Sequence, residues 1–134
     1  MNESGFWLLR CGNQVLTAID QVPESIFPYG RADDFGNPRD ALRIGEWQGL
    51  PCFAAEVERL PDNVSGEPTT VGRLYARAGA EAFALAGRAT QLLDWQKNHR
   101  YCGGCGTPTE IKSGEFAMSC PACGLLAFPR ITPA

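Results

Sequence analysis

Two Cys-x-x-Cys pairs near the end of the sequence constrain its fold more than any other feature. Cys102 and Cys105 form the first pair, Cys120 and Cys123 form the second, and fourteen residues separate Cys105 from Cys120. Two turns of this kind can present four thiolates to one tetrahedral zinc ion at a Zn–S distance of about 2.3 Å. A glycine follows each pair and permits a tight turn that aims backbone N–H groups at the sulfurs. We therefore predict a zinc site with these four cysteines as its ligands.

The segment between the two pairs predicts a short β-hairpin. Ser113 and Gly114 are a turn signal, and the flanking stretches 109–111 and 115–118 are strand-like. A hairpin between two cysteine turns is the arrangement of a zinc ribbon. Four thiolates fill a tetrahedral site and leave no position open for water, so the predicted zinc is structural rather than catalytic. The alternative role for the cysteines is redox chemistry. A thioredoxin-like redox site has a single Cys-x-x-Cys near a βαβ pattern, and no βαβ pattern surrounds these two pairs.

The composition is that of a globular protein. Of the 134 residues, 44% are hydrophobic and 20% are charged, which excludes the signature of a disordered chain and fits one ordinary or two small domains. The net charge of −3 disfavours a strongly attracting surface for nucleic acid or anionic membranes. The first apolar stretch, 6–9, is too short for a signal peptide or a membrane helix. We expect a soluble, cytoplasmic protein without a membrane partner, in which paired cysteines bind metal rather than form disulfides.

Upstream of the cysteine pairs the sequence predicts strands followed by one long helix. Residues 6–11 and 14–19 predict a hairpin across Gly12 and Asn13, because such a loop supplies the positive φ that tight hairpins need. Residues 41–49 and 52–58 predict a second strand pair. The stretch 32–35 is a candidate short helix, and 60–70 reads as a surface loop. The remaining cysteines, Cys11 and Cys52, lie in these strand-like runs, where each is expected to behave as a small buried hydrophobe.

The long helix is predicted over residues 79–98 from the 3.6-residue spacing of its apolar side chains. Its expected buried face consists of Ala82, Leu85, Ala86, Ala89, Leu92 and Leu93. Its expected exposed face consists of Glu81, Arg88, Gln91, Asp94 and Asn98. The predicted fold class is therefore α+β: a small antiparallel β domain with one long helix, followed by a zinc-ribbon hairpin unit.

Several motifs resemble one known family. The strings are NHRYCGGCG at 98–106, EFAMSC at 115–120 and FPRITPA at 128–134, with FPYG at 27–30, ALRIGEWQG at 41–49 and LAGR at 85–88 upstream. They are similar to NADH pyrophosphatases, which are Nudix hydrolases composed of an N-terminal domain, a zinc ribbon and a Nudix domain. The resemblance implies an N-terminal domain over 1–98, a zinc ribbon over 99–130, and the start of a linker to an absent Nudix domain at 131–134.

The resemblance also implies an activity and a set of substrate-binding residues. Family members are homodimers that need Mg²⁺ or Mn²⁺, cleave the diphosphate of NAD(H) to give nicotinamide mononucleotide and AMP, and are implicated in removing NAD caps from RNA. By resemblance, Phe128 matches the aromatic residue that stacks on the nicotinamide side of the substrate. Glu115 in the ribbon hairpin and Arg73 upstream of the long helix match two further substrate-binding residues.

The chain departs from the family pattern in one respect. The Nudix box contains an Arg-Glu-x-x-Glu-Glu string whose carboxylates hold the catalytic divalent metals, and the 134 residues contain no such string. Whether the chain is an enzyme is therefore left open. The expectation is the non-catalytic N-terminal half, either a piece of a longer enzyme or a natural truncation, inactive alone, with Mg²⁺ or Mn²⁺ bound only in the missing domain.

Two non-catalytic functions of the chain remain as alternative hypotheses. The chain could be a stand-alone zinc-ribbon module that binds nucleic acid or a protein partner, because interleaved cations and aromatics can neutralise phosphates and stack bases. It could also be a dimerisation scaffold. The cations and aromatics in question are Lys97, Arg100, Lys112 and Arg130, and Tyr101, Phe116 and Phe128.

Overall fold

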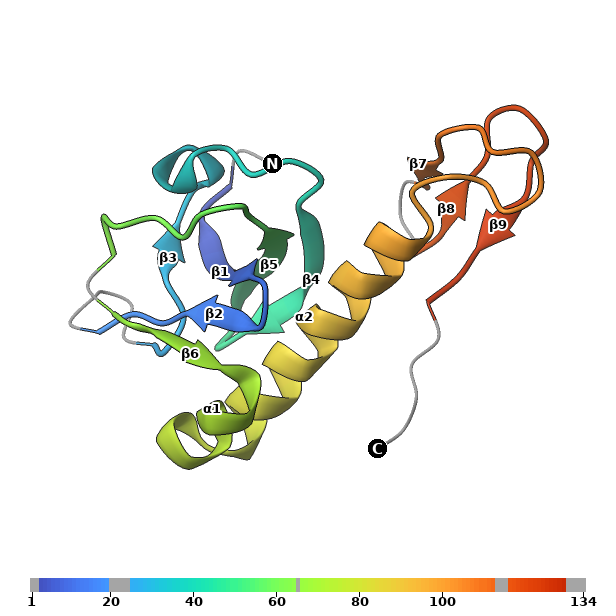
Figure 1. Cartoon of the computed structure of the whole chain (residues 1–134). Coiled ribbons are helices and arrows are strands. Elements are labelled where there is room, and N and C mark those ends of the chain that lie inside the picture. Colours follow the sequence, from blue (N-terminus) through green and yellow to red (C-terminus); the bar gives the residue numbers. More distant parts are fainter. Residues whose placement is uncertain (1–2, 20–24, 65, 113–115, 130–134) are drawn as a thin grey trace. The chain divides into compact units, whose positions relative to one another are not determined.

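The computed structural model describes residues 3–19, 25–64, 66–112 and 116–129. The chain divides into two compact units, 1–90 and 91–134. We describe each unit by itself, with Figure 1 as the guide to their elements.

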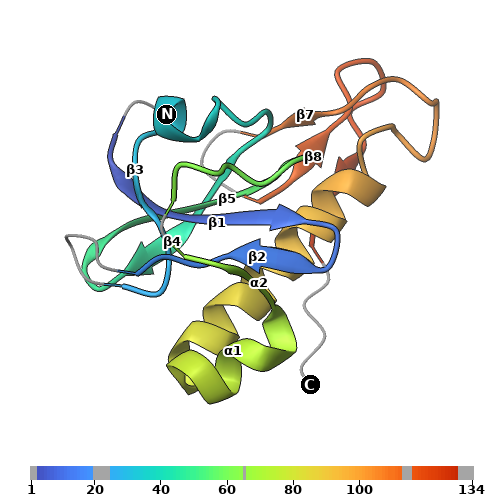
Figure 2. The same ribbon diagram turned by 60° about the vertical axis from the view of Figure 1, so that its left-hand side comes forward.

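Strand β1 (Gly5–Cys11) is the centre of the sheet in the first unit. It forms the predicted antiparallel hairpin with β2 (Gln14–Leu16), and Gly12 in the connecting turn has a φ of 61°. The short strand β3 (Tyr29–Gly30) pairs antiparallel with the beginning of β1. On its other side β1 pairs with β5 (Leu50–Glu56), as Figure 2 shows, and this pairing is parallel. The sheet is therefore mixed, whereas the sequence pattern had indicated antiparallel strands only.

The second predicted strand pair is also present. β4 (Leu42–Trp47) pairs antiparallel with β5, and a turn at Gln48 and Gly49 connects them. The strand order in the sheet is β4-β5-β1-β2-β6. β6 (Pro68–Thr70) was not predicted, since residues 60–70 were expected to form a surface loop; in the structure it pairs antiparallel with β2.

A core of aromatic and aliphatic side chains lies on one face of this sheet. Trp7, Leu9 and Phe53 are fully buried in it, and the ring of Trp7 lies 4.9 Å from that of Phe53 and 5.8 Å from that of Phe35. The opposite face is buried as well, because residues 52–55 of β5 are all inaccessible to solvent. A strand covered on both faces does not alternate between apolar and polar residues, so the sequence pattern of β5 is weak.

The predicted long helix is α2 (Ala80–Asn98), and its expected faces are confirmed: the predicted exposed residues are exposed, and those of the other face are buried or half-buried. A shorter helix, α1 (Val71–Ala78), precedes it and was not predicted. Gly79 separates the two with a φ of 92°, which favours glycine. Two arginines bind the first half of α2 to the sheet: Arg10 Nη1 donates to the carbonyl of Thr90 (3.4 Å), and Arg88 Nε donates to that of Ile44 (3.2 Å). The predicted short helix is a 3-10 helix, Ala32–Phe35.

The second unit contains a small sheet of three strands, β7 (Glu110–Ile111), β8 (Met118–Ser119) and β9 (Leu126–Ala127). β7 and β8 pair antiparallel as the predicted hairpin, although its turn residues Ser113 and Gly114 lie outside the described residues. β9 adds a third strand that was not predicted from the sequence. Within the described ranges, no helix combines the length and the apolar character needed to cross a membrane.

Candidate metal centre

The first cysteine pair lies in a tight turn between the end of α2 and β7. The backbone N–H of Cys102 donates to the carbonyl of Thr107 (2.8 Å), and the N–H of Gly106 donates back to the carbonyl of Cys102 (2.9 Å). Gly106 has a φ of 79°, in the left-handed region that side chains other than glycine rarely adopt. The glycine after the pair is therefore required by the turn, as the sequence predicted.

The second pair repeats this backbone arrangement between β8 and β9. The N–H of Cys120 donates to the carbonyl of Leu125 (3.0 Å), and the N–H of Gly124 donates to the carbonyl of Cys120 (3.0 Å). Gly124 also has a φ of 79°. We call the segments 102–107 and 120–125 the first and second knuckles. The two knuckles therefore offer the same geometry from different parts of the chain.

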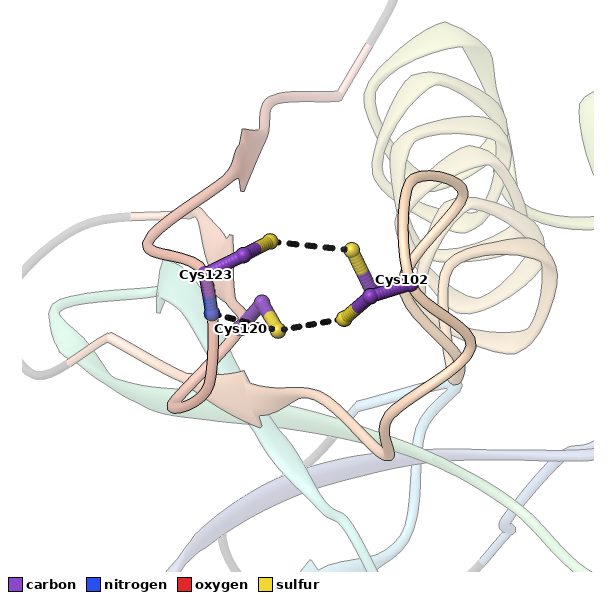
Figure 3. A group of neighbouring side chains, drawn as sticks. Cys102, Cys120 and Cys123 are labelled. Atoms are coloured by element: carbon purple, nitrogen blue, oxygen red, sulfur yellow. Dashed lines mark hydrogen bonds between the residues drawn. The ribbon is translucent and has the colours of Figure 1, made fainter.

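The four sulfur atoms of the knuckles converge on one point. All of them lie within 4.8 Å of one another. The Sγ atoms of Cys102 and Cys123 are 3.6 Å apart, and those of Cys105 and Cys120 are 3.5 Å apart. Figure 3 shows the sulfurs facing each other across the space between the knuckles, with these two contacts as dashed lines. Tetrahedral zinc with Zn–S bonds of about 2.3 Å needs sulfurs about 3.8 Å apart, so this cluster has suitable dimensions.

The same distances argue against a disulfide interpretation. All four cysteines are free, and the sulfur contacts of 3.5 and 3.6 Å are far longer than a disulfide bond of about 2.05 Å. Backbone donors already point at two of the sulfurs: Gly104 N lies 3.3 Å from Cys102 Sγ, and Cys123 N lies 3.4 Å from Cys120 Sγ. Such donors stabilise the thiolate form, which is the form that binds metal.

The electrostatics of the cluster show why it suits a cation. The backbone N–H groups of Cys105 and Gly104 lower the pKa of Cys102. Thr107, whose Oγ1 lies 3.2 Å from the sulfur, lowers the pKa of Cys105 to about 6. The N–H of Leu125 acts in the same direction on Cys123, but the neighbouring sulfurs of Cys102 and Cys120 outweigh it and raise the pKa of Cys123 to about 12. The last thiol therefore resists ionising beside the other sulfurs, and a bound divalent cation would remove this penalty.

Comparison with known protein families gives two matches along the chain. The family described as "NADH pyrophosphatase-like rudimentary NUDIX domain" matches residues 4–95, and the family described as "NADH pyrophosphatase zinc ribbon domain" matches residues 97–128. The chain belongs to the NADH pyrophosphatase family. Its cysteine knuckles are those of the zinc ribbon of this family.

Individual relatives carry the name "NAD-capped RNA hydrolase NudC". The protein from Actinobacillus succinogenes is 33% identical over 136 residues, which cover 99% of this chain and 48% of the relative. The protein from Salmonella paratyphi B is 34% identical over 132 residues, covering 98% of this chain and 47% of the relative. The protein from Stutzerimonas stutzeri is 36% identical over 90 residues, covering 67% and 33% respectively. The chain thus spans at most about half the length of these relatives.

The three substrate-binding residues suggested by the family resemblance belong to different parts of the chain. Arg73 is exposed on α1 in the first unit. Phe128 follows β9 in the second unit, with 55% of its surface exposed. Glu115 lies outside the described residues. Their role in substrate binding therefore stays a prediction.

Two side chains near the cysteines were not assigned a role at the metal site from the sequence. Thr107 contacts Cys105, and the only signal for it is a hydroxyl residue directly after the Cys-x-x-Cys-Gly string. Thr109 donates its hydroxyl proton to the carbonyl of His99 (2.5 Å) and so holds the end of α2 to the strand entering the ribbon. His99 itself directs Nδ1 at the carbonyl of Trp95 (2.8 Å), one helical turn earlier. His99 directly follows the last residue of α2 and is half-buried.

Proposed function

We propose that this chain is the N-terminal and zinc-ribbon part of an NAD(H) pyrophosphatase, and that its own task is to hold one structural zinc ion and contribute to the substrate site. The observation that supports this most directly is the convergence of four cysteine sulfurs within 4.8 Å in a segment that matches the family's zinc ribbon. Zinc bound there has four protein ligands and no open position, so it stabilises the fold without activating water.

The metal is tested by elemental analysis of the purified protein. We expect one zinc per chain, lost on substitution of Cys120→Ser and retained in the control Cys11→Ser. Cys11 has the same chemistry, but its sulfur donates to the carbonyl of Glu58 (3.4 Å) in the first unit. Protein free of zinc after purification in zinc-containing buffer would contradict this part of the proposal.

The parent reaction is hydrolysis of the NAD(H) diphosphate to nicotinamide mononucleotide and AMP, on free NAD(H) or on the NAD cap of an RNA. Phosphoryl chemistry of this kind needs divalent ions to polarise the phosphate oxygens. The carboxylates that would hold Mg²⁺ or Mn²⁺ belong to the Nudix box, whose string the 134 residues lack. We expect no AMP when this chain alone is incubated with NADH and Mg²⁺, and clear AMP release would contradict the proposal.

Substrate contacts of this part are proposed for Arg73, Phe128 and Glu115. The exposed ring of Phe128 is available for stacking on the nicotinamide side, and the exposed guanidinium of Arg73 is available for a phosphate. The test joins residues 1–134 to the remaining part of the Salmonella relative and measures NADH hydrolysis. We expect Arg73→Ala to raise KM by about 10-fold or more, as for a lost charged hydrogen bond.

Matched controls exist for both described residues. Arg77 is exposed on the same helix as Arg73, and Leu126 precedes Phe128 with 39% of its surface exposed. Arg77→Ala and Leu126→Ala should leave KM unchanged. Equal effects of the arginine variants would mean that only the general positive charge of α1 matters.

Assembly and location complete the proposal. We infer a homodimer in the cytoplasm, with the domain boundaries predicted after residues 98 and 130. Sedimentation equilibrium tests the dimer, and a monomer at micromolar concentration would contradict it for this part of the enzyme.

A second candidate function is nucleic-acid binding by the ribbon. Its support is the exposure of Tyr101 (64%) and Phe128 (55%) on a unit that also exposes the cations Arg100 and Lys112. Aromatic rings stack on bases, and cations neutralise phosphates in a salt-dependent way. Retention of single-stranded RNA that falls with salt and with Tyr101→Ala would favour this function, and no retention at low salt would exclude it.

A further inference from the structure

The four cysteines of the metal centre differ in their exposure to solvent in a regular way. Cys102 and Cys120, the first cysteine of each knuckle, are buried, with 6% and 2% of their surfaces exposed. Cys105 and Cys123, the second cysteine of each knuckle, are exposed. Each knuckle thus contains one exposed and one buried cysteine.

The contacts between the sulfurs cross from one knuckle to the other. Exposed Cys105 lies 3.5 Å from buried Cys120, and exposed Cys123 lies 3.6 Å from buried Cys102 (Figure 3). Closing either contact to a disulfide requires the sulfurs to approach by about 1.5 Å, which side-chain rotation can supply. An accessible sulfur that reacts with an oxidant therefore has a protected partner beside it on the opposite knuckle.

We propose that the ribbon is a site of reversible oxidation by peroxides, in which Cys105 and Cys123 react first and Cys120 and Cys102 then close two disulfides across the knuckles with release of the metal. This inference rests on the proposed zinc site. It adds a modification that the hydrolase function does not require.

The chemistry is balanced with peroxide as the only oxidant. The sulfur of Cys105 attacks one peroxide oxygen, the O–O bond breaks, and a sulfenic acid and hydroxide form. The sulfur of Cys120 then attacks the sulfur of Cys105, the S–O bond breaks, and a disulfide and a second hydroxide form; protons from solvent convert both hydroxides to water. Cys123 and Cys102 react in the same way. Two peroxide molecules are reduced and four thiolates are oxidised per ribbon, so no thiolate ligand remains for the metal.

The crossed pairing has a structural consequence. Both disulfides would join the first knuckle to the second, so the oxidised ribbon keeps its two cysteine turns together after the metal leaves. Disulfides within each Cys-x-x-Cys pair would leave the knuckles unconnected. The two outcomes differ in covalent connectivity and are distinguishable in the intact chain.

The experiment uses the full chain loaded with zinc, in a Cys11→Ser background that removes the half-exposed thiol outside the ribbon. Zinc content is measured first. Hydrogen peroxide is then added in increasing amounts while released zinc is followed with a chromogenic chelator and free thiols with Ellman's reagent. Trypsin cleaves after Lys112, between the knuckles, so nonreducing mass spectrometry separates the two connectivities.

We expect zinc release in step with the loss of four thiols, and one linked species containing peptides 101–112 and 113–130. Fragmentation of that species should give the pairs Cys105–Cys120 and Cys102–Cys123. Dithiothreitol with added zinc should restore both the thiols and the metal.

Three outcomes would overturn the inference while leaving the zinc site intact. They are zinc retained at peroxide concentrations that oxidise a free thiol control, two separate peptides each lighter by about 2 Da, and cross-linked pairs other than those named. A protein without zinc before peroxide is added would instead refute the proposed function.

Discussion

Different kinds of interaction stabilise the folds of the two units of the molecule. The first unit has a core in which Trp7, Phe6, Phe27 and Phe53 are fully buried. In the ribbon beyond α2, the described buried side chains are only those of Cys102, Ala117, Met118 and Cys120. A unit this small cannot bury enough apolar surface to be stable alone, so metal binding must supply its folding free energy. The comparison shows two routes to a stable fold within one chain, and each can be perturbed separately.

Removal of the metal should have the largest effect. A strong chelator is expected to unfold the ribbon and leave the sheet of the first unit folded, because apparent zinc-binding free energies in such sites reach about 10 kcal/mol or more. Limited trypsin digestion should show rapid cleavage after Lys112, while circular dichroism retains the β signal of the first unit. An unchanged digestion pattern in protein shown to have lost its zinc would contradict this view.

Truncation of Trp7 is the complementary experiment, because it weakens the first unit instead of the ribbon. Trp7→Ala deletes a ring that is 0% exposed and packs against Phe35 and Phe53, so the first unit should lose about 3–5 kcal/mol of unfolding free energy. Guanidinium titration measures this loss, and elemental analysis should show that zinc content is unchanged. Tyr75→Ala, at a side chain that is 60% exposed, is the control and should cost much less. Equal losses of unfolding free energy in the two variants would show that packing around Trp7 is not the main source of stability of the first unit.

Alkaline pH tests the buried thiol of the first unit, Cys52. Burial raises the pKa of Cys52 from 9.0 to about 12. In the unfolded chain this thiol ionises near pH 9, so its contribution to stability is complete below pH 9 and is lost as the pH rises towards 12. The slope is at most about 1.4 kcal/mol per pH unit. We expect the wild type to lose stability over this window faster than Cys52→Ala, and parallel curves would show that Cys52 ionises normally.

The smallest predicted effect is a stabilisation. Gly87 lies inside α2, and a Cβ added there would meet nothing within 4 Å. Gly87→Ala should therefore raise the unfolding free energy by about 0.5–1 kcal/mol through helix propensity. Gly66→Ala is the contrasting variant, since its Cβ would collide with the backbone of Thr17 and should destabilise the first unit. Thermal unfolding of both variants measures the difference in sign.

The sequence predicted best what depends on residues close together in the chain. The ribbon was predictable because each knuckle needs only a Cys-x-x-Cys-Gly string, and the hairpin of β1 and β2 because Gly12 and Asn13 supply its turn. The α2 helix was predictable from its 3.6-residue period.

The sequence predicted poorly what depends on distant pairing. The parallel register of Phe6 with Cys52 joins residues far apart in the chain, and no local pattern specifies it. β6 is only three residues long and begins with Pro68, so its strand character comes from β2 rather than from its own residues. The proposed substrate-binding role of Arg73 has no local signal either, and only the family resemblance suggests it.

The central place of β1 has a consequence for biosynthesis. The ribosome makes β1 first, yet its parallel neighbour β5 is complete only when Glu56 has been added, and β6 is complete only at Thr70. Until then the nascent chain carries an apolar strand whose edges lack these neighbours, and such strands aggregate readily. Early truncated translation products of this protein should therefore depend on chaperones, whereas the ribbon can close as soon as its last cysteine leaves the exit tunnel and meets metal.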